Sequence, residues 1–483
     1  MATDTQARPA GNTPSESATK HWYQYIFINA NWFALTLRSQ VLAGLVIPLL
    51  VQGFVGEAQK GSYYGTIRLW GLMVALLMQA LFGLLSDHSR FRWGRRRPFI
   101  FLGAVLEAVI ILSIIWIANL QGMTGYSVLF AAYLFAMISS NMSQAGTQGL
   151  IPDVVPQARR GIASGVKMLM EVPLPLILFG LVIAPMVSRG NLPTALVVTV
   201  IAMLVCMGLA MLVREKPVTT PREPLNWKPF LSLVLMTAVF TGIILGLGQI
   251  VKWLIPALSG ASRFTFGAIG VTAMLIAVVA GIFAALRVHL DKSVGKNRPF
   301  IWLVISRLAA LVAINNISSF LLYFVQEKFD MPGAEAAGLA GRLPLVLGAF
   351  VILFGLVAGW LADRFDRRVL TALSGVVGAV GVAVMVVFGT IPMMYVAAAI
   401  IGLAYALFNV ASWALGTEII PQDRAGEFLG LQNLAGAGAG AIGAYIGGVI
   451  ADQSGYLLMM SMFGVMFLLA SVAALNIRYR KPA

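Results

Sequence analysis

In 483 residues the chain has 59% hydrophobic and only 11% charged residues, with 34 basic residues against 19 acidic ones. This balance excludes a soluble globular protein of this length and predicts a helical protein that crosses a membrane many times. Most basic residues fall in loops on one side of the expected spans, which is the positive-inside pattern and argues against nucleic acid as a partner.

The chain divides into four parts by its apolar runs. Residues 1–21 are polar and predict a disordered cytoplasmic tail, with no removable signal peptide before the first span. Residues 22–213 and 298–483 each hold six runs of spanning length, and residues 214–297 hold two inserted runs between cytoplasmic linkers. The runs lie at 32–55, 64–86, 98–119, 126–149, 162–185, 193–213, 231–252, 264–286, 300–325, 343–362, 369–390, 392–415, 427–450 and 456–477.

These runs predict an all-α polytopic membrane protein with 14 spans and both termini in the cytoplasm. The count falls by two if the runs at 231–252 and 264–286 lie in the membrane interface instead of crossing it. Each of the two is long enough to cross, and Lys252 and Arg263 stand at run ends, so we expect crossing.

The loop between the second and third runs carries the clearest motif, GLLSDHSRFRWGRRRP from Gly83 to Pro98. Five arginines within about ten residues hold this loop on the cytoplasmic side. Gly83 and Asp87 are one turn apart on one helix face. A glycine there lets a second helix approach, and a carboxylate beside it binds a helix N-terminus. The second half repeats the pair as Gly359 and Asp363 in GWLADRFDRR.

A second motif also occurs once in each half, after the fourth run. Asp153, Pro156, Gln157, Arg159, Gly161 and Gly165 recur as Glu418, Pro421, Gln422, Arg424, Gly426 and Gly430 at one constant spacing. A repeated six-helix unit is typical of two pseudo-symmetric bundles.

The first motif, G-x-x-S-D followed after a spacer by G-R-R-R-P-F, resembles the loop between the second and third helices of major facilitator superfamily transporters. Its ending is similar to that of the sucrose–proton symporters and the glycoside–pentoside–hexuronide cation symporters. The resemblance covers residues 22–213 and 298–483. It implies two pseudo-symmetric six-helix bundles, with residues 231–286 as two extra central helices.

The two motifs together predict a gate between the bundles on the cytoplasmic face. Asp87 is expected to cap the helix that starts around Gly426 to Gly430, and Asp363 the one around Gly161 to Gly165. The predicted gating residues are Gly83, Asp87, Arg95, Arg96, Gly359, Asp363 and Arg367.

Enzymatic and metal-binding motifs are missing from the sequence. No phosphate-binding loop and no HExxH occur, Cys206 is alone, and the three histidines lie in tails or loops. We therefore expect no catalytic residue, no metal and no cofactor, and interpret the chain as a secondary transporter that uses an ion gradient.

We single out five charged residues inside expected spans, where each costs about 2.5–3.5 kcal/mol and so suggests a function. Glu171 and Lys167 are four residues apart and share a helix face. Glu171 is predicted to couple the proton, and a permanent structural ion pair with Lys167 is the alternative. Glu107, the other candidate acid, also suits a structural hydrogen-bonding role. Arg38 and Arg307 either contact substrate or extend to the lipid headgroups.

Neutral polar side chains suit a sugar, whose hydroxyls need both donors and acceptors. The same side chains also hold helices together, so each of them has both interpretations. The glycine run Gly436, Gly440, Gly447 and Gly448 is expected to pack helices closely rather than bind a ligand. The predicted substrate-binding set is Arg38, Asn141, Gln144, Gln148, Arg307, Asn315, Asn316, Asn409, Trp413, Gln432 and Asn433.

The sequence thus predicts a symporter that moves a sugar or glycoside with a proton, or with sodium, by alternating access. We expect a monomer in the plasma membrane (the inner membrane of a bacterium), with the lipid bilayer as its other partner. One alternative is a multidrug–proton antiporter, although the fifth run reads EVPLPLILFG and lacks the GPxxGG pattern of that group. The other is a non-transporting membrane protein on the same fold.

Overall fold

Six helical segments of membrane-spanning length make up the first half of the computed structural model, which describes residues 21–215, 225–257, 262–288, 298–419 and 425–478. Prolines stand in the first turn of the third and sixth segments, where the backbone N–H has no helical partner. The segments are α1, η2 and α2 (Tyr23–Val41, Leu42–Val46, Ile47–Val55), α3 (Lys60–His88), α4 (Arg97–Ile117), α5 (Gly122–Val154), then η3, α6, α7, η4 and α8 (Gln157–Arg159, Arg160–Glu171, Pro173–Leu178, Phe179–Ile183, Ala184–Ser188), and α9 (Leu192–Met211).

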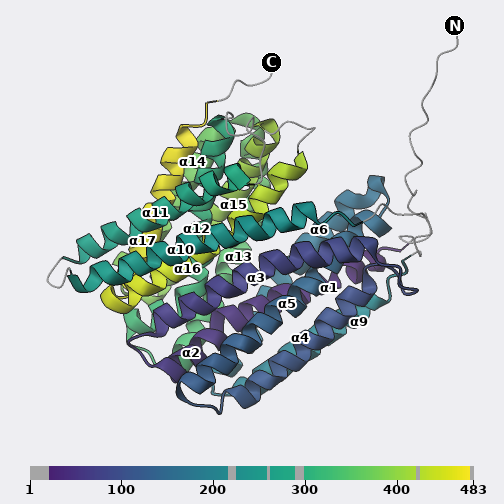
Figure 1. Ribbon diagram of the computed structural model, residues 1–483, viewed down its shortest axis with the longest axis horizontal. Coiled ribbons are helices and arrows are strands. Elements are labelled where there is room, and N and C mark those ends of the chain that lie inside the picture. Colours follow the sequence, from purple (N-terminus) through teal and green to yellow (C-terminus); the bar gives the residue numbers. More distant parts are fainter. Residues whose placement is uncertain (1–20, 216–224, 258–261, 289–297, 420–424, 479–483) are drawn as a thin grey trace, which may run out of the picture.

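The second half repeats this order of helices. In both halves the first segment packs against the fourth, fifth and sixth, and the third packs against the fourth and sixth. Figure 1 shows the halves side by side, the first in purple to blue and the second in green to yellow. The pseudo-symmetric pair of six-helix bundles is therefore confirmed. The helices of the second half are α12 (Arg298–Phe329), α13 (Gly333–Arg364), α14 (Arg367–Val387), α15 (Ile391–Ile419), α16 (Ala425–Ser454) and α17 (Tyr456–Leu475).

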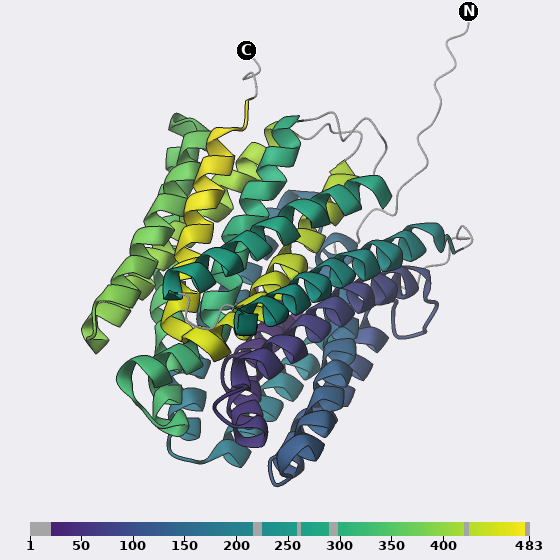
Figure 2. The same cartoon turned by 60° about the vertical axis from the view of Figure 1, so that its left-hand side comes forward.

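Two extra helices, α10 (Lys228–Ala257) and α11 (Arg263–Val288), form a hairpin outside this repeat. The hairpin packs against α16 and α17 and also touches α3 (Figure 2). The Phe240 ring fills the space left by Gly281 of α11 and Gly438 of α16, so it fastens three helices at one point. Thirteen helices of the described residues, α10 and α11 among them, are long and apolar enough to cross a membrane, and α16 is the fourteenth expected segment.

Most helix ends agree with the apolar runs to within one or two turns, but the first helix begins at Tyr23 instead of residue 32. The polar residues that interrupt its apolar run are buried and bonded to neighbouring helices. Asn31 Nδ2 donates to Ser143 Oγ at 2.9 Å, and Asn29 Nδ2 donates to a backbone carbonyl of α6. The earlier start places Arg38 about 22 Å along the helix, well inside the bundle.

Candidate functional site

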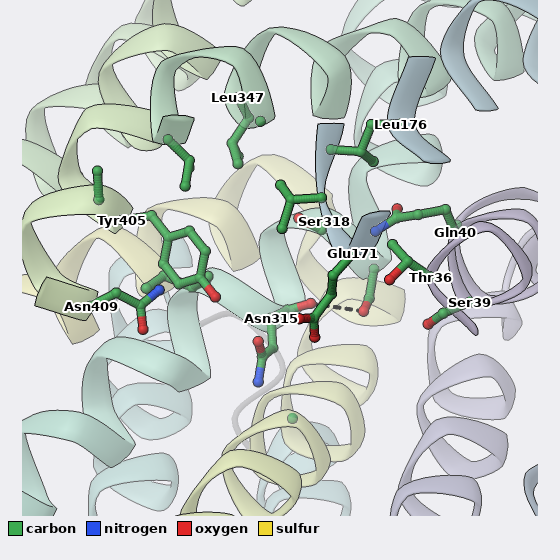
Figure 3. Close-up of a pocket in the computed structure, with 18 of the residues that line it drawn as sticks. Thr36, Ser39, Gln40, Glu171, Leu176, Asn315, Ser318, Leu347, Tyr405 and Asn409 are labelled. Carbon is green, nitrogen blue, oxygen red and sulfur yellow. Dashed lines mark hydrogen bonds between the residues drawn. The ribbon is translucent and has the colours of Figure 1, made fainter. Parts of the chain in front are cut away.

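A cavity of about 1000 Å³ lies between the two halves. Figure 3 shows Glu171, Asn315, Tyr405 and Asn409 with their polar ends toward the same space. Hydroxyl, amide and charged groups share the wall with leucine side chains, an arrangement that suits a polar organic molecule. The polar lining is Thr36, Ser39, Gln40, Arg68, Lys167 and Glu171 from the first half and Asn315, Ser318, Ser319, Tyr405, Asn409 and Trp413 from the second.

Lys167 and Glu171 line this cavity as an ion pair on successive turns of α6. Lys167 Nζ is 3.5 Å from Glu171 Oε2 and 3.9 Å from the centre of the Trp32 ring, so a cation–π contact supports the ammonium on its other side. The helix breaks at Val172 directly after the carboxylate, and α7 starts at Pro173. This interruption places the carboxylate at a joint between two helix segments.

Arg68 of α3 is a cavity residue that the search for charges within spans missed. Its Nη1 donates to Tyr133 Oη at 3.0 Å and its Nη2 to Ser319 Oγ of the other half at 3.2 Å. Its Nε is buried without a hydrogen-bond partner, and no carboxylate of the described residues pairs with it. The signal was present in the sequence, because Arg68 lies inside the apolar run at 64–86.

Arg38 and Arg307 occupy corresponding places in the first helix of each half. Arg38 Nη2 donates to Ser140 of α5, and Arg307 Nη1 donates to Ser412 of α15 at 2.5 Å. Both arginines are buried, with 6% and 5% of their surface exposed, so neither extends to the lipid headgroups. Arg38 Nε also pairs with Glu107 Oε1 at 2.7 Å. Glu107 therefore balances a buried arginine inside the first bundle.

The second half has no acid in the place of Glu107. Counted from the first residue of α4 and of α14, the position of Glu107 corresponds to Val377. Arg307 instead lies 5.6 Å from the Phe408 ring and 5.1 Å from the Trp413 ring. Since no carboxylate in the described part of the chain pairs with Arg307, its positive charge is not neutralised by the protein there.

The amides predicted to bind substrate divide into two groups. Asn315 and Asn409 line the cavity, as does Trp413. Asn141 and Asn316 donate to backbone carbonyls of their own helices, and Asn316 also donates to one of α16, so both fasten the bundle. Gln144 and Gln148 are not among the residues of the cavity wall, and the side chains of Gln432 and Asn433 lie outside the described residues.

The Major Facilitator Superfamily model matches residues 303–483. A crystal structure of a POT-type peptide transporter aligns with a TM-score of 0.68 and 16% identity over 96% of each chain. A D-xylose–proton symporter structure aligns with a TM-score of 0.58 and 15% identity over 94% of this chain and 97% of the other. The chain has the major facilitator fold.

Two known protein sequences also resemble the chain, one over most of its length and one over about a third of it. An uncharacterized symporter of Synechocystis sp. is 23% identical over 445 residues, which are 81% of this chain and 79% of that one. A lysosomal dipeptide transporter of Gallus gallus is 25% identical over 157 residues, which are 32% of this chain and 34% of the other.

At one end of the major facilitator fold, here called the basic end, the loop 89–96 binds acids of its own half. Arg96 Nη2 lies 2.5 Å from Asp87 Oδ1, and Arg96 Nε lies 2.9 Å from Asp153 Oδ2. Arg95 Nε donates to the same Asp153 oxygen at 2.7 Å. Asp153, the first residue of the second repeated motif, therefore anchors the first motif.

The second half repeats this anchor with fewer charges. Arg367 Nη1 lies 2.8 Å from Glu418 Oε1, and Glu418 is the repeat of Asp153. Asp363 is 3.9 Å from Arg367 Nη2, and 81% of its side chain is exposed. The two halves thus use corresponding residues to hold their loops at the basic end.

The predicted gate between the bundles is not formed around Asp363 in this conformation, because its side chain is exposed instead of capping α6. The start of α16, where Asp87 was expected to bind, lies outside the described side chains. Among the described residues, no neighbouring segment comes within 4 Å of where a side chain would start at Gly83, Gly359, Gly161 or Gly165.

At the opposite end, here called the far end, side chains join the two halves directly. Asp452 near the end of α16 accepts hydrogen bonds from the first amides of α3, Gly61 N and Ser62 N, each at 2.7 Å. Lys60 Nζ donates to Gln326 Oε1 of α12 at 2.9 Å. A carboxylate of one half therefore does cap a helix of the other, at the far end and between residues that the sequence analysis did not select.

We call the contacts of Asp452 and Lys60 between the two halves the far-end gate. Several further groups hold Lys60 in place there. Its Nζ is 2.6 Å from Glu57 Oε2 and 4.7 Å from the centre of the Tyr323 ring. Burial would raise the pKa of Glu57, but hydrogen bonds from Lys60 and Gln52 outweigh it and lower the pKa. Tyr323 Oη in turn donates to the Pro48 carbonyl of the first half at 2.7 Å.

Glycines make the backbones of α3 and α16 meet behind this gate. A Cβ atom on Gly61 would lie 2.7 Å from the Gly448 carbonyl oxygen, and one on Gly65 would clash with the Ala444 carbonyl. Small residues four apart on both helices permit this approach. The packing role expected for Gly448 is confirmed, and the conformation is closed at the far end.

Proposed function

We propose that the chain is a secondary active transporter that moves a polar organic solute, a sugar or glycoside, together with a proton by alternating access. The observation that carries the proposal is the Lys167–Glu171 pair in the wall of a cavity lined by both halves. Alternating access needs such a cavity, and proton coupling needs a group in it that gains and loses a proton.

Glu171 suits the coupling role because of its neighbours. Its carboxylate lies 3.5 Å from the Lys167 ammonium in the cavity wall, so the two charges separate or approach when the helix segments move. Glu171 ends α6 at the break before Pro173, where a change in bend alters that separation. Movement between conformations would thereby be converted into uptake or release of a proton.

The neutral cavity groups favour a hydroxylated solute. Gln40, Asn315 and Asn409 each offer a donor and an acceptor, and Tyr405 and Trp413 offer ring surfaces. Similarity to a D-xylose–proton symporter supports a sugar, and partial similarity to a lysosomal dipeptide transporter makes dipeptides the second class to test.

A multidrug–proton antiporter is less consistent with the cavity charges. Arg68 and Lys167 face the space with Glu171 as the acid among its lining residues, a balance that repels cationic drugs.

We place the basic end and both termini in the cytoplasm of a plasma-membrane monomer, since basic loops resist translocation. The uptake experiment distinguishes transport from a non-transporting role on the same fold.

The test is uptake of solutes into proteoliposomes under an imposed pH gradient, with a sodium gradient as the alternative driving force. The solutes are sugars, dipeptides and cationic dyes, and liposomes without protein are the control. We expect a sugar or glycoside to accumulate with the pH gradient. Glu171→Gln should abolish uphill accumulation and leave exchange at equal pH intact. Glu335→Gln removes an exposed acid of α13 outside the cavity and should leave accumulation unchanged. Accumulation by Glu171→Gln would refute the coupling role, and dye efflux without sugar uptake would refute the function.

A further inference from the structure

Around the cavity, the described basic side chains outnumber the acidic ones. Glu171 compensates Lys167, and Glu107 compensates Arg38. Arg68 and Arg307 have only hydroxyl and aromatic partners among the described residues. An uncompensated charge inside a membrane protein is costly and is retained where it serves a ligand or an ion.

Arg68 is the member of this pair that reaches the cavity wall. Its guanidinium is a planar fork of donors that fits a carboxylate with two parallel hydrogen bonds. The present acceptors, Tyr133 and Ser319, are neutral, and the Nε donor has no partner. The protein thus positions the guanidinium, whose buried Nε is closed to the cavity, while the second N–H of each Nη group and the uncompensated charge remain available to a ligand.

The position of Arg68 also joins the two halves. Tyr133 belongs to α5 of the first half and Ser319 to α12 of the second. Along α12, Ser319 is about 18 Å from Arg307, with Asn315 between them. A solute whose acidic end lies at Arg68 therefore extends along neutral polar groups, in the positive field of both arginines.

We propose that the transported solute carries a carboxylate and that Arg68, at the junction of α3, α5 and α12, is the residue that binds it. The proposal rests on the proposed function of the cavity as the transport site and narrows its substrate to an organic acid. The carboxylate accepts hydrogen bonds from the Nη groups of Arg68, whose present partners belong to both halves, so it binds at the junction of the halves just inside the far-end gate.

The test is calorimetric titration of the purified protein in nanodiscs with two matched ligand pairs. Glucuronate is compared with glucose, and N-acetyl-alanylalanine with its C-terminal amide, so that charge is separated from the rest of the molecule. One charge-assisted bidentate contact predicts a preference for the acid of between about tenfold and a hundredfold in at least one pair. Arg68→Gln should remove the preference, and Arg68→Lys should keep part of it. The control Arg342→Gln removes an exposed arginine of α13 outside the cavity and should keep all of it.

Equal affinities within both pairs for the wild-type protein, no binding at all, or a preference that survives in Arg68→Gln would overturn the proposal. If Arg68→Gln does not purify as a folded monodisperse protein, the wild-type comparison and Arg68→Lys still decide. Proton-driven uptake of glucose without a preference for glucuronate would leave the proposed function standing and refute Arg68 as an acid-binding residue. Arg68-dependent binding of the acids without uptake would support Arg68 as an acid-binding residue and refute the proposed transport function.

Discussion

Replacement of Asp452 by Asn should open the far end of the protein. The carboxylate accepts the amides of Gly61 and Ser62 at the start of α3, each at 2.7 Å, so it holds the two halves together across the gate. Asparagine keeps one oxygen acceptor but loses the negative charge and the second acceptor. The closed conformation therefore loses stability, while the fold of each half is left intact.

The size of the effect follows from the geometry. A carboxylate at a partly buried helix N-terminus contributes up to about 2 kcal/mol, and the remaining amide oxygen retains a part of this. The closed state should lose about 1–2 kcal/mol, which raises the population open at the far end by about 5- to 30-fold. The change is large enough to measure and small enough to leave both conformations populated.

The assay is the labelling rate of a single cysteine behind the gate, at Ser318 in a Cys206→Ala background, by a membrane-impermeant maleimide added at the far end. Ser318 lines the cavity, so its labelling reports opening. Asp330→Asn is the matched control, because Asp330 is an exposed acid in the same far-end vestibule. An unchanged rate in Asp452→Asn, or an equal increase in Asp330→Asn, would refute the role of the cap.

Three further predictions concern packing, charge and topology. Gly65→Val should also favour the open state, because its side chain would clash with the Ala444 carbonyl; the same labelling assay measures this, and Gly53→Val, at a glycine with nothing within 4 Å, is the control. Glu107→Gln should destabilise the protein by about 3–5 kcal/mol because it leaves Arg38 buried without a counter-charge. Its melting temperature in detergent should rise again when Arg38→Gln is added, and a double variant no more stable than Glu107→Gln alone would contradict this. Cysteines at positions 259 and 293 should be labelled from opposite sides of the membrane, and labelling from one side would remove the hairpin from the set of crossing helices.

The sequence predicted the helices well because each buries an apolar run in lipid, and a run of that length has few other uses. It predicted the Lys167–Glu171 pair because both residues belong to one helix. The Arg38–Glu107 pair joins helices that are distant in sequence, so its members were noted singly and their contact was not.

The far-end gate was missed for a related reason. Lys60 and Asp452 stand at helix ends, where charges ordinarily meet water or headgroups, and neither is unusual until the two halves are placed together. The same carboxylate-to-helix chemistry was expected from Asp87 and Asp363, whose motif is visible in the sequence. One sequence serves every conformation of the protein, so no residue pattern shows which end of the cavity is closed in this one.

The α10–α11 hairpin makes the two halves unequal as moving bodies. Phe240 of the hairpin packs against Gly438 of α16, and Lys252 of the hairpin lies 5.6 Å from the centre of the Tyr445 ring of α16, so the hairpin is fastened mainly to the second half. When the halves rock against each other, viscous drag from lipid acts on eight helices on one side and on six on the other. In the frame of the bilayer the first half is then expected to make the somewhat larger excursion, with α3 sliding past the hairpin.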